Sequence, residues 1–149
     1  MEIVAHVRSS AGTHDASVST AGTAQAVAIP VRRGAPGAAV DGGELLMLAL
    51  ATCYCNDLYR EGARLGIPID AVEVEARADF EGAGLAATNV RYRARVASPA
   101  PAADVAALLE HTDAVAEVHN TLRAGAGVVR LEWDGIDGDG EAMPSSAGG

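Results

Sequence analysis

One stretch decides the fold of this protein: GELLMLALATCYCNDLYREGARL, residues 43–65. We predict a single helix over Glu44–Leu65, because Asp41 suits an N-terminal cap and Glu44 places a negative charge in the first turn. Gly66 is a natural helix stop. The run Leu45–Ala51 is apolar on every side, which is typical of a helix buried on every side. We therefore expect this helix at the centre of the protein, with a partner subunit helping to enclose it.

Strand patterns lie on both sides of the helix. Three segments precede it, separated by glycine-containing turns: Ile3–Arg8, Ala16–Thr20 and Ala24–Val31. Two longer segments follow it, Ala71–Phe80 and Asn89–Ala97, and both alternate apolar with charged residues. The charges of the first are mostly acidic and those of the second are arginines. Antiparallel pairing would place opposite charges across from each other, so these two segments are expected to form a hairpin.

The remaining chain predicts more helix and one more strand. A helical stretch is expected over Ala103–Arg123, with a break near Thr112-Asp113, and a last strand over Val128–Asp134. Residues 135–149 are rich in Gly, Asp and Ser and are expected to form a disordered tail. The order of elements lacks the regular alternation of a parallel α/β protein. It predicts an α+β fold with mostly antiparallel sheet, in a single domain over residues 1–134.

Composition excludes several classes of function. The chain has 149 residues and a formal net charge of −9, and all 11 basic residues are arginines. An acidic protein without a basic run is a poor match for nucleic acids or anionic membranes. No apolar stretch reaches the ~18 residues that a membrane span requires. The sequence starts with a strand pattern rather than a signal peptide, so we expect a cytoplasmic protein with free thiols.

The two cysteines occupy different faces of the helix. At 100° per residue, Cys53 and Cys55 point about 200° apart, so they cannot form a disulfide with each other while the helix is intact. Cys55 falls on a wholly apolar face. Cys53 falls where the apolar half meets Asp57, Arg60 and Arg64. Nearby guanidinium groups would favour its ionisation, whereas Asp57 would oppose it unless neutralised by Arg60. Cys53 is thus either a reactive thiol or a small buried hydrophobic residue.

Two segments resemble a known family. The segment Gly43–Tyr54, with its Ala-Leu-Ala-x-Cys pattern after an acidic residue, resembles the motif around the reactive cysteine of the OsmC/Ohr family. These are osmotically induced and organic-hydroperoxide-resistance proteins. The segment His111–Leu122 is similar to the second helix of that family, and the order of elements also agrees. The resemblance covers roughly Ile3 to Asp134.

The resemblance implies an intertwined homodimer, with two central helices packed between sheets from both chains. It also implies thiol-dependent reduction of organic hydroperoxides, a defence against oxidative stress that needs no cofactor. In active members a cysteine attacks the peroxide and becomes a sulfenic acid, a second cysteine closes a disulfide, and an external dithiol reduces it. Cys53 matches the attacking cysteine, and Glu44 matches the acidic residue at the helix start.

The sequence departs from the family pattern at two places. The position of the second cysteine is occupied by Ala116. The early-strand arginine that activates thiol and peroxide has no clear match, so Arg8, Arg32 or Arg33 would have to reach the site. An external thiol would then resolve the sulfenic acid. Alternatively, the protein is a non-enzymatic dimer that binds a small apolar ligand on the same scaffold.

Histidines offer little sign of a metal site. His111 and His119 are eight residues apart, which differs from the i, i+4 spacing of a helical metal pair, and the sequence has no Cys-x-x-Cys. We therefore expect no metal ion. His119 follows the region of the family's second cysteine, so it is either a base that activates Cys53 or an ordinary interface histidine.

Overall fold

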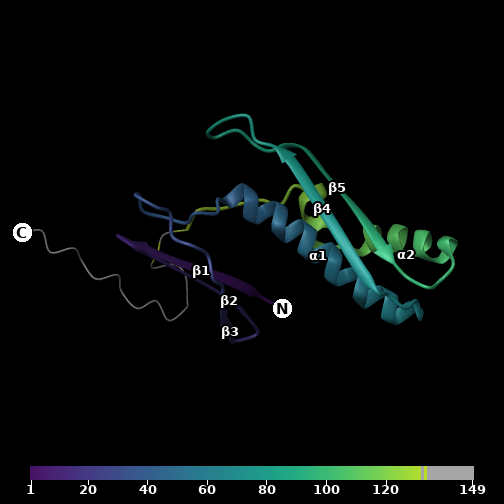
Figure 1. Ribbon diagram of the computed structural model, residues 1–149. Coiled ribbons are helices and arrows are strands. Elements are labelled where there is room, and N and C mark those ends of the chain that lie inside the picture. Colours follow the sequence, from purple (N-terminus) through teal and green to yellow (C-terminus); the bar gives the residue numbers. More distant parts are fainter. Residues whose placement is uncertain (132, 134–149) are drawn as a thin grey trace, which may run out of the picture.

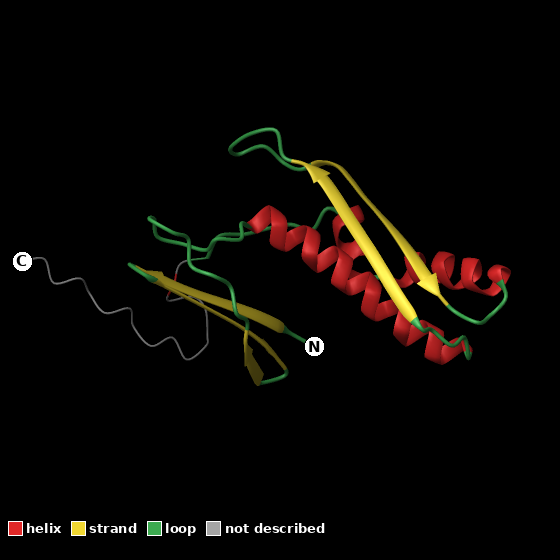
Figure 2. Ribbon diagram, in the orientation of Figure 1, coloured by secondary structure: helices red, strands yellow, loops and turns green. Residues whose placement is uncertain are grey.

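The computed structural model describes residues 1–131 and 133. In chain order, the elements are β1 (Ile3–Ser10), β2 (Thr13–Thr20), β3 (Thr23–Ala26), α1 (Gly42–Leu65), β4 (Ala71–Asp79), β5 (Thr88–Ala97), α2 (Ala102–Val115) and α3 (Glu117–Ala124). Strands β1, β2 and β3 form one antiparallel sheet, and β4 pairs with β5 in another. Figure 2 shows how the helices lie relative to both sheets. The predicted α+β class with antiparallel sheet is confirmed.

Helix α1 begins and ends where the sequence predicts, within two residues. At its start, the backbone N–H of Glu44 donates to Oδ1 of Asp41, and the backbone N–H of Asp41 donates to Oε2 of Glu44, both at 2.8 Å. This reciprocal capping box satisfies two amides that would otherwise lack partners. At its end, Gly66 adopts a left-handed conformation with φ of 70°. Glycine accepts this conformation at no steric cost, so the helix stops there.

The hairpin of β4 and β5 matches its predicted pairing. Glu73 lies opposite Arg95, and Glu75 lies opposite Arg93. Arg93 and Arg95 form ion pairs with the glutamates across from them, on the face that points to solvent. The other face of the hairpin packs on α1, whose whole length lies along it in Figure 1. The alternation of apolar and charged residues thus places one face against the helix and one in water.

The core lies around the C-terminal half of α1. Tyr54 and Leu58 of α1, Leu108 of α2 and Ala116 form its buried centre. Apolar residues of β4 and β5 cover this centre from one side, and α2 covers it from the other. Leu58 and Leu108 have no exposed surface. The core therefore fixes the angle at which α2 and α3 lie against α1.

In one chain, the N-terminal half of α1 and the three-stranded sheet expose apolar side chains to solvent. Leu48 of α1 is 59% exposed, and Ile3 and Val7 of β1 are 65% and 57% exposed. Figure 1 shows the three-stranded sheet set apart from the hairpin. One chain alone therefore does not bury α1 on every side, because too few of its elements surround the first half of the helix. Burial on every side was predicted with the help of a partner subunit, and it stays a prediction.

The second helical region breaks later than expected. The prediction placed the break near Thr112-Asp113, but the helix continues to Val115 and breaks at Ala116, where ψ is 112°. The hydroxyl of Thr112 donates to the carbonyl of Leu108 inside α2 rather than capping a new helix. A threonine can bond in this way to the preceding turn, so its side chain does not by itself mark a helix start.

Two predicted strand segments are only partly strands or not strands at all. β3 ends at Ala26, and Val31 makes only an isolated bridge with Ala38. Residues 128–131 do not form a strand, and Val128 is 97% exposed. Alternation of apolar residues predicts which face of a strand would be buried, but it does not by itself produce the hydrogen-bonded ladder that defines a strand. The rest of that predicted strand, residues 132 and 134, and the predicted tail 135–149 lie outside the described residues, as does any test of the domain boundary at 134.

Among the helices that the structure describes, none is long and apolar enough to cross a membrane.

Candidate functional site

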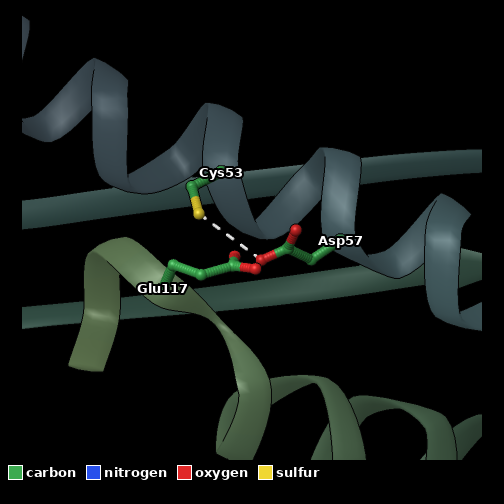
Figure 3. Close-up of side chains that lie close together, drawn as sticks. All are labelled: Cys53, Asp57 and Glu117. Atoms are coloured by element: carbon green, nitrogen blue, oxygen red, sulfur yellow. Dashed lines mark hydrogen bonds between the residues drawn. The ribbon is translucent and has the colours of Figure 1, made fainter. Parts of the chain in front are cut away.

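The candidate site centres on Cys53, in the middle of α1. Its Sγ is partly buried and donates a hydrogen bond to Oδ2 of Asp57, one helical turn later, at 3.4 Å. Glu117, the first residue of α3, brings a third side chain to the same place. Figure 3 shows the carboxylates of Asp57 and Glu117 side by side below the thiol. The ligand atoms of the three residues all lie within 4.8 Å of one another.

The break between α2 and α3 creates this arrangement. Ala116 leaves the helical conformation and is completely buried, so α3 starts against α1 rather than continuing away from it. The backbone N–H of Val118 in the first turn of α3 donates toward the Cys53 thiol. Position 116, which matches the family's second cysteine, is therefore a buried core residue, and its neighbour Glu117 is the residue that faces Cys53.

Burial and negative charge keep the thiol protonated. Burial raises the pKa of Cys53, the carboxylates of Asp57 and Glu117 raise it further, and only the Val118 amide opposes them. Asp57 is 4% exposed, and its own pKa is also raised, mainly by burial. The prediction that guanidinium groups assist ionisation of Cys53 is wrong for this structure, because the carboxylate of Asp57 rather than an arginine contacts the sulfur.

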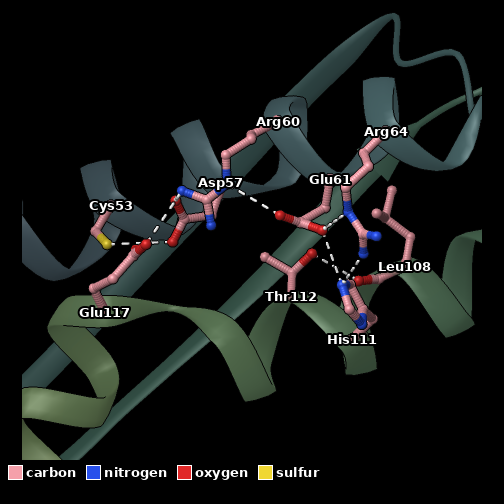
Figure 4. Close-up of polar contacts among 9 residues, drawn as sticks. All are labelled: Cys53, Asp57, Arg60, Glu61, Arg64, Leu108, His111, Thr112 and Glu117. Carbon is pink, nitrogen blue, oxygen red and sulfur yellow. Dashed lines mark hydrogen bonds and ion pairs between the residues drawn. The ribbon is translucent and has the colours of Figure 1, made fainter.

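The two arginines of α1 neutralise the acidic groups instead. Arg60 Nη1 lies 2.6 Å from Oδ1 of Asp57 and 3.4 Å from Oε1 of Glu117, and Arg60 Nε lies 3.0 Å from Glu61. Arg64 Nε lies 2.7 Å from the other oxygen of Glu61. Figure 4 shows this row of alternating charges along α1. Arg60 therefore partly neutralises the two carboxylates that lie beside Cys53.

Glu61 joins this row to α2. Its side chain is buried, and its second oxygen contacts Nε2 of His111 at 2.9 Å. Hydrogen bonds from Arg64, Arg60 and His111 lower the pKa of Glu61 to about 2. The buried carboxylate stays ionised because charged donors surround it. This contact helps to hold α2, and with it α3, in place against α1.

The comparisons with known proteins identify the family. The family model described as "OsmC-like protein" matches residues 35–131. The chain belongs to this OsmC-like family. The match includes α1, Cys53 and the whole of the site around it. No curated protein matches the sequence.

Solved structures share the OsmC-like fold at low sequence identity. An OsmC-like protein from Mycoplasma pneumoniae is 12% identical with a TM-score of 0.57, covering 83% of this chain and 87% of that chain. An organic hydroperoxide resistance protein OsmC from Legionella pneumophila is 14% identical with a TM-score of 0.55, covering 83% and 90%. An OsmC-like hydroperoxide resistance protein from Jannaschia sp. is 19% identical with a TM-score of 0.51, covering 87% and 90%. At these identities the likeness shows the fold alone.

Other predicted site residues of this OsmC-like protein lie away from Cys53. Glu44 is nine residues earlier on the same helix, which is about 13 Å along its axis, and its carboxylate caps the helix. Within one protomer it is therefore not placed to act on the thiol. Arg32 donates to the carbonyl of Ala38 in its own loop. Arg8 lies on β1, and Arg33 lies in the loop between β3 and α1. Both are outside the elements that form the site.

An apolar cavity of about 430 Å³ lies next to the site, between α1, β5 and α3. Leu46 and Leu50, on the same side of α1 as Cys53, line it together with Val90, Leu122 and His119. The two leucines occupy the turns that precede the thiol. The cavity therefore offers apolar surface of the kind that small-molecule sites use.

His119 is buried rather than placed as a base for Cys53. It is 3% exposed, and its ring packs against Tyr54 and Tyr92 with centroid distances of 5.3 and 4.4 Å. Neither ring nitrogen has a hydrogen-bond partner among the described residues. Burial lowers the pKa of His119, so the ring is kept neutral. The structure therefore does not support the interpretation of His119 as a base for Cys53, and the ring packs inside this chain. The other interpretation, an interface histidine, stays a prediction.

Sequence reasoning missed Glu117 and Val118 as neighbours of Cys53. Asp57 was recognisable, because residues four apart share a helix face. The N-terminal position of Glu117 on a helix became recognisable only once the break was known to fall at Ala116. The placement of α3 against α1 depends on core packing, for which the sequence has no local signal.

Proposed function

We propose that this OsmC-like protein reduces organic hydroperoxides at Cys53. One observation carries the proposal: the cysteine at the family's reactive position is partly buried at the junction of α1 and α3, and a largely apolar pocket is lined by Leu46 and Leu50, which precede it on the same side of α1. An organic hydroperoxide has an apolar body and a small polar end, which suits this combination. Two proteins of the same fold carry hydroperoxide resistance in their names.

The proposed reaction oxidises Cys53 to a sulfenic acid and reduces the hydroperoxide to an alcohol. Resolution by an internal disulfide is not available from position 116, because alanine occupies it. Cys55 cannot take that role while α1 is helical, because it faces another side of the helix. We therefore propose an external thiol as the reductant. Two thiols return the sulfenic acid to Cys53 and are released as a disulfide and water.

The test follows consumption of cumene hydroperoxide in the presence of dithiothreitol. The wild type and Cys55→Ser are expected to consume the peroxide at equal rates, and Cys53→Ser is expected to lose the activity. Mass spectrometry after one equivalent of peroxide, with dimedone present, should find the adduct on Cys53 alone. Equal rates for the wild type and Cys53→Ser would contradict the proposal.

A homodimer is the second part of the proposal. One chain leaves apolar side chains open on α1 and on the three-stranded sheet, as Leu48 and Val7 show. Covering these surfaces with a second copy would remove them from water, which is the main favourable term in association. Light scattering at micromolar concentration should give the mass of two chains, about twice 15.1 kDa. A monomer under these conditions would contradict this part.

A different function fits two of the same observations. The raised pKa of Cys53 and the apolar cavity would also suit a non-enzymatic protein that binds a small apolar ligand. Native mass spectrometry of freshly purified protein separates the two functions. A retained apolar ligand together with an unreactive Cys53 would favour binding, whereas an empty cavity and rapid trapping of a sulfenic acid would favour the peroxidase.

A further inference from the structure

The chemistry at Cys53 needs two proton transfers. A thiolate rather than a thiol attacks the peroxide, so the thiol proton must leave. When the O–O bond breaks, the departing alkoxide must gain a proton. A single group that accepts the first proton and donates it again would serve both steps.

Resting on the proposed peroxidase function, we infer that Asp57 is this group. Its Oδ2 already receives the hydrogen bond of the Cys53 thiol at 3.4 Å, so it contacts the reacting atom directly. Its other oxygen is held by Arg60 at 2.6 Å. The side chain is 4% exposed, so bulk water has little access to the proton that it would hold.

The surroundings of Asp57 suit a base as well as an acid. Arg60 on its own helix and Glu117 on α3 face it, and His119 of α3 also acts on it electrostatically. Burial raises the pKa of Asp57, and Glu117 adds to this, while Arg60 and the Cys53 hydrogen bond oppose it. A carboxylate with a raised pKa binds a proton more strongly than an exposed aspartate. It therefore accepts the thiol proton with a smaller energetic penalty.

The step balances without any further reactant. The Cys53 S–H proton passes to Oδ2 of Asp57, and the sulfur electron pair attacks the terminal oxygen of the hydroperoxide R–O–O–H. An S–O bond forms, the O–O bond breaks, and R–O⁻ leaves. The alkoxide takes the proton from Asp57 and becomes R–O–H. Cys53 ends as the sulfenic acid S–OH, and Asp57 ends as the carboxylate with which it began.

Glu117 provides a contrast on the same site. Its side chain is 68% exposed, and it is bound to Arg60 rather than to the sulfur. It contributes negative charge near Cys53 but does not contact the reacting atom. Replacement of Glu117 therefore removes a charge without removing the proton acceptor, which makes it a useful comparison for Asp57.

The test compares two reactions of Cys53. Alkylation by iodoacetamide needs a thiolate but no proton for the leaving iodide, whereas reaction with cumene hydroperoxide needs both. In Asp57→Asn the neighbouring negative charge is gone, so alkylation at pH 7 should become several-fold faster. The peroxide reaction should become at least tenfold slower, since general acid–base catalysis typically contributes about 10²–10⁴-fold. In Glu117→Gln both reactions should speed up together, and Asp57→Glu should recover part of the peroxide rate.

Glu73→Gln, which neutralises an exposed carboxylate on the solvent face of β4, should change neither rate. The wild type gives a second test that does not depend on folding of a variant. Its alkylation rate should follow the thiolate fraction, while its peroxide rate should depend less on pH, so the ratio of peroxide rate to alkylation rate should fall as pH rises. Identical pH profiles, or a parallel rise of both rates in Asp57→Asn, would overturn the role of Asp57 alone. A wild type without Cys53-dependent peroxide loss would overturn the proposed function and, with it, this inference.

Discussion

Replacement of His119 by phenylalanine should stabilise this protein. His119 is 3% exposed, and neither ring nitrogen has a hydrogen-bond partner among the described residues. Phenylalanine keeps an aromatic ring against Tyr54 and Tyr92, whose contacts contribute about 0.5–1.5 kcal/mol each beyond simple burial. It removes the two unpaired polar atoms.

The expected gain is a balance of two terms. An unsatisfied buried donor or acceptor costs roughly 1–3 kcal/mol. Phenylalanine is larger than histidine, and overpacking costs typically 1–3 kcal/mol in a tight core. The cavity of about 430 Å³ beside His119 gives the larger ring room, so the second term should be at the low end of its range. We expect a net gain in the free energy of unfolding of about 1–5 kcal/mol, since two unpaired atoms cost roughly 1–3 kcal/mol each and the packing cost is about 1 kcal/mol.

The stability that His119→Phe gains over the wild type should be larger at acid pH. Burial lowers the pKa of His119 below its usual 6.5 in the folded protein. Below that pH the unfolded chain binds a proton that the folded chain does not, so the wild type loses stability as pH falls. The variant lacks this group and avoids that loss. Urea unfolding at pH 7.5 and 5.5, at one fixed protein concentration, measures both effects.

In a matched control, the same substitution at His111 should change the free energy of unfolding in the opposite direction. His111 Nε2 contacts Glu61 at 2.9 Å and Arg64 at 2.7 Å. His111→Phe removes this hydrogen-bond partner and should destabilise the protein by about 1 kcal/mol. If His119→Phe also destabilises by 1 kcal/mol or more at both pH values, the ring nitrogens of His119 have a partner in solution. The reasoning from unpaired atoms would then be refuted.

Three further changes test the fold. Lowering the pH from 4.5 towards 2 should destabilise the wild type more than Glu61→Gln. The pKa of Glu61 in the folded protein is about 2, so the stability that the ionised carboxylate contributes is lost as the carboxylate gains a proton. Acid unfolding followed by circular dichroism measures this loss. Leu58→Ala should lower the free energy of unfolding by about 2–5 kcal/mol in urea titrations, because the side chain is fully buried. Gly66→Ala should lower the thermal midpoint by a few degrees, through a cost of about 1–2 kcal/mol at its φ of 70°; an unchanged midpoint would contradict the cap.

Local rules predicted the elements that depend on near neighbours. The capping box of Asp41 and Glu44 involves residues three apart, and the end of α1 at Gly66 depends on one residue's backbone freedom. The hairpin of β4 and β5 was predictable for a similar reason, because the acidic strand and the arginine strand match across a short loop. In these cases the stabilising contacts join residues that are close in the sequence, or join two neighbouring strands whose charges alternate in the same way.

The site was predicted only in part. The helical spacing placed Cys53 apart from Cys55 and next to Asp57, and the family pattern indicated Cys53 as the reactive residue. The predicted opposition of Asp57 to ionisation of Cys53 was correct. The predicted help from arginines was wrong, because Arg60 can reach several acids and the sequence does not say which. Arg60 turns to Asp57, Glu61 and Glu117, and leaves the thiol beside a carboxylate.

The amino-acid sequence alone thus determined that a long helix carries Cys53 at the border of its apolar and polar sides. The tertiary structure decided which groups meet the thiol there. Packing of Leu58, Leu108 and Ala116 sets the turn between α2 and α3, and that turn brings Glu117 to Cys53, 64 positions away in the chain. Contacts between distant positions depend on the angle at which packed helices meet, and that angle is a property of the whole core rather than of any local segment.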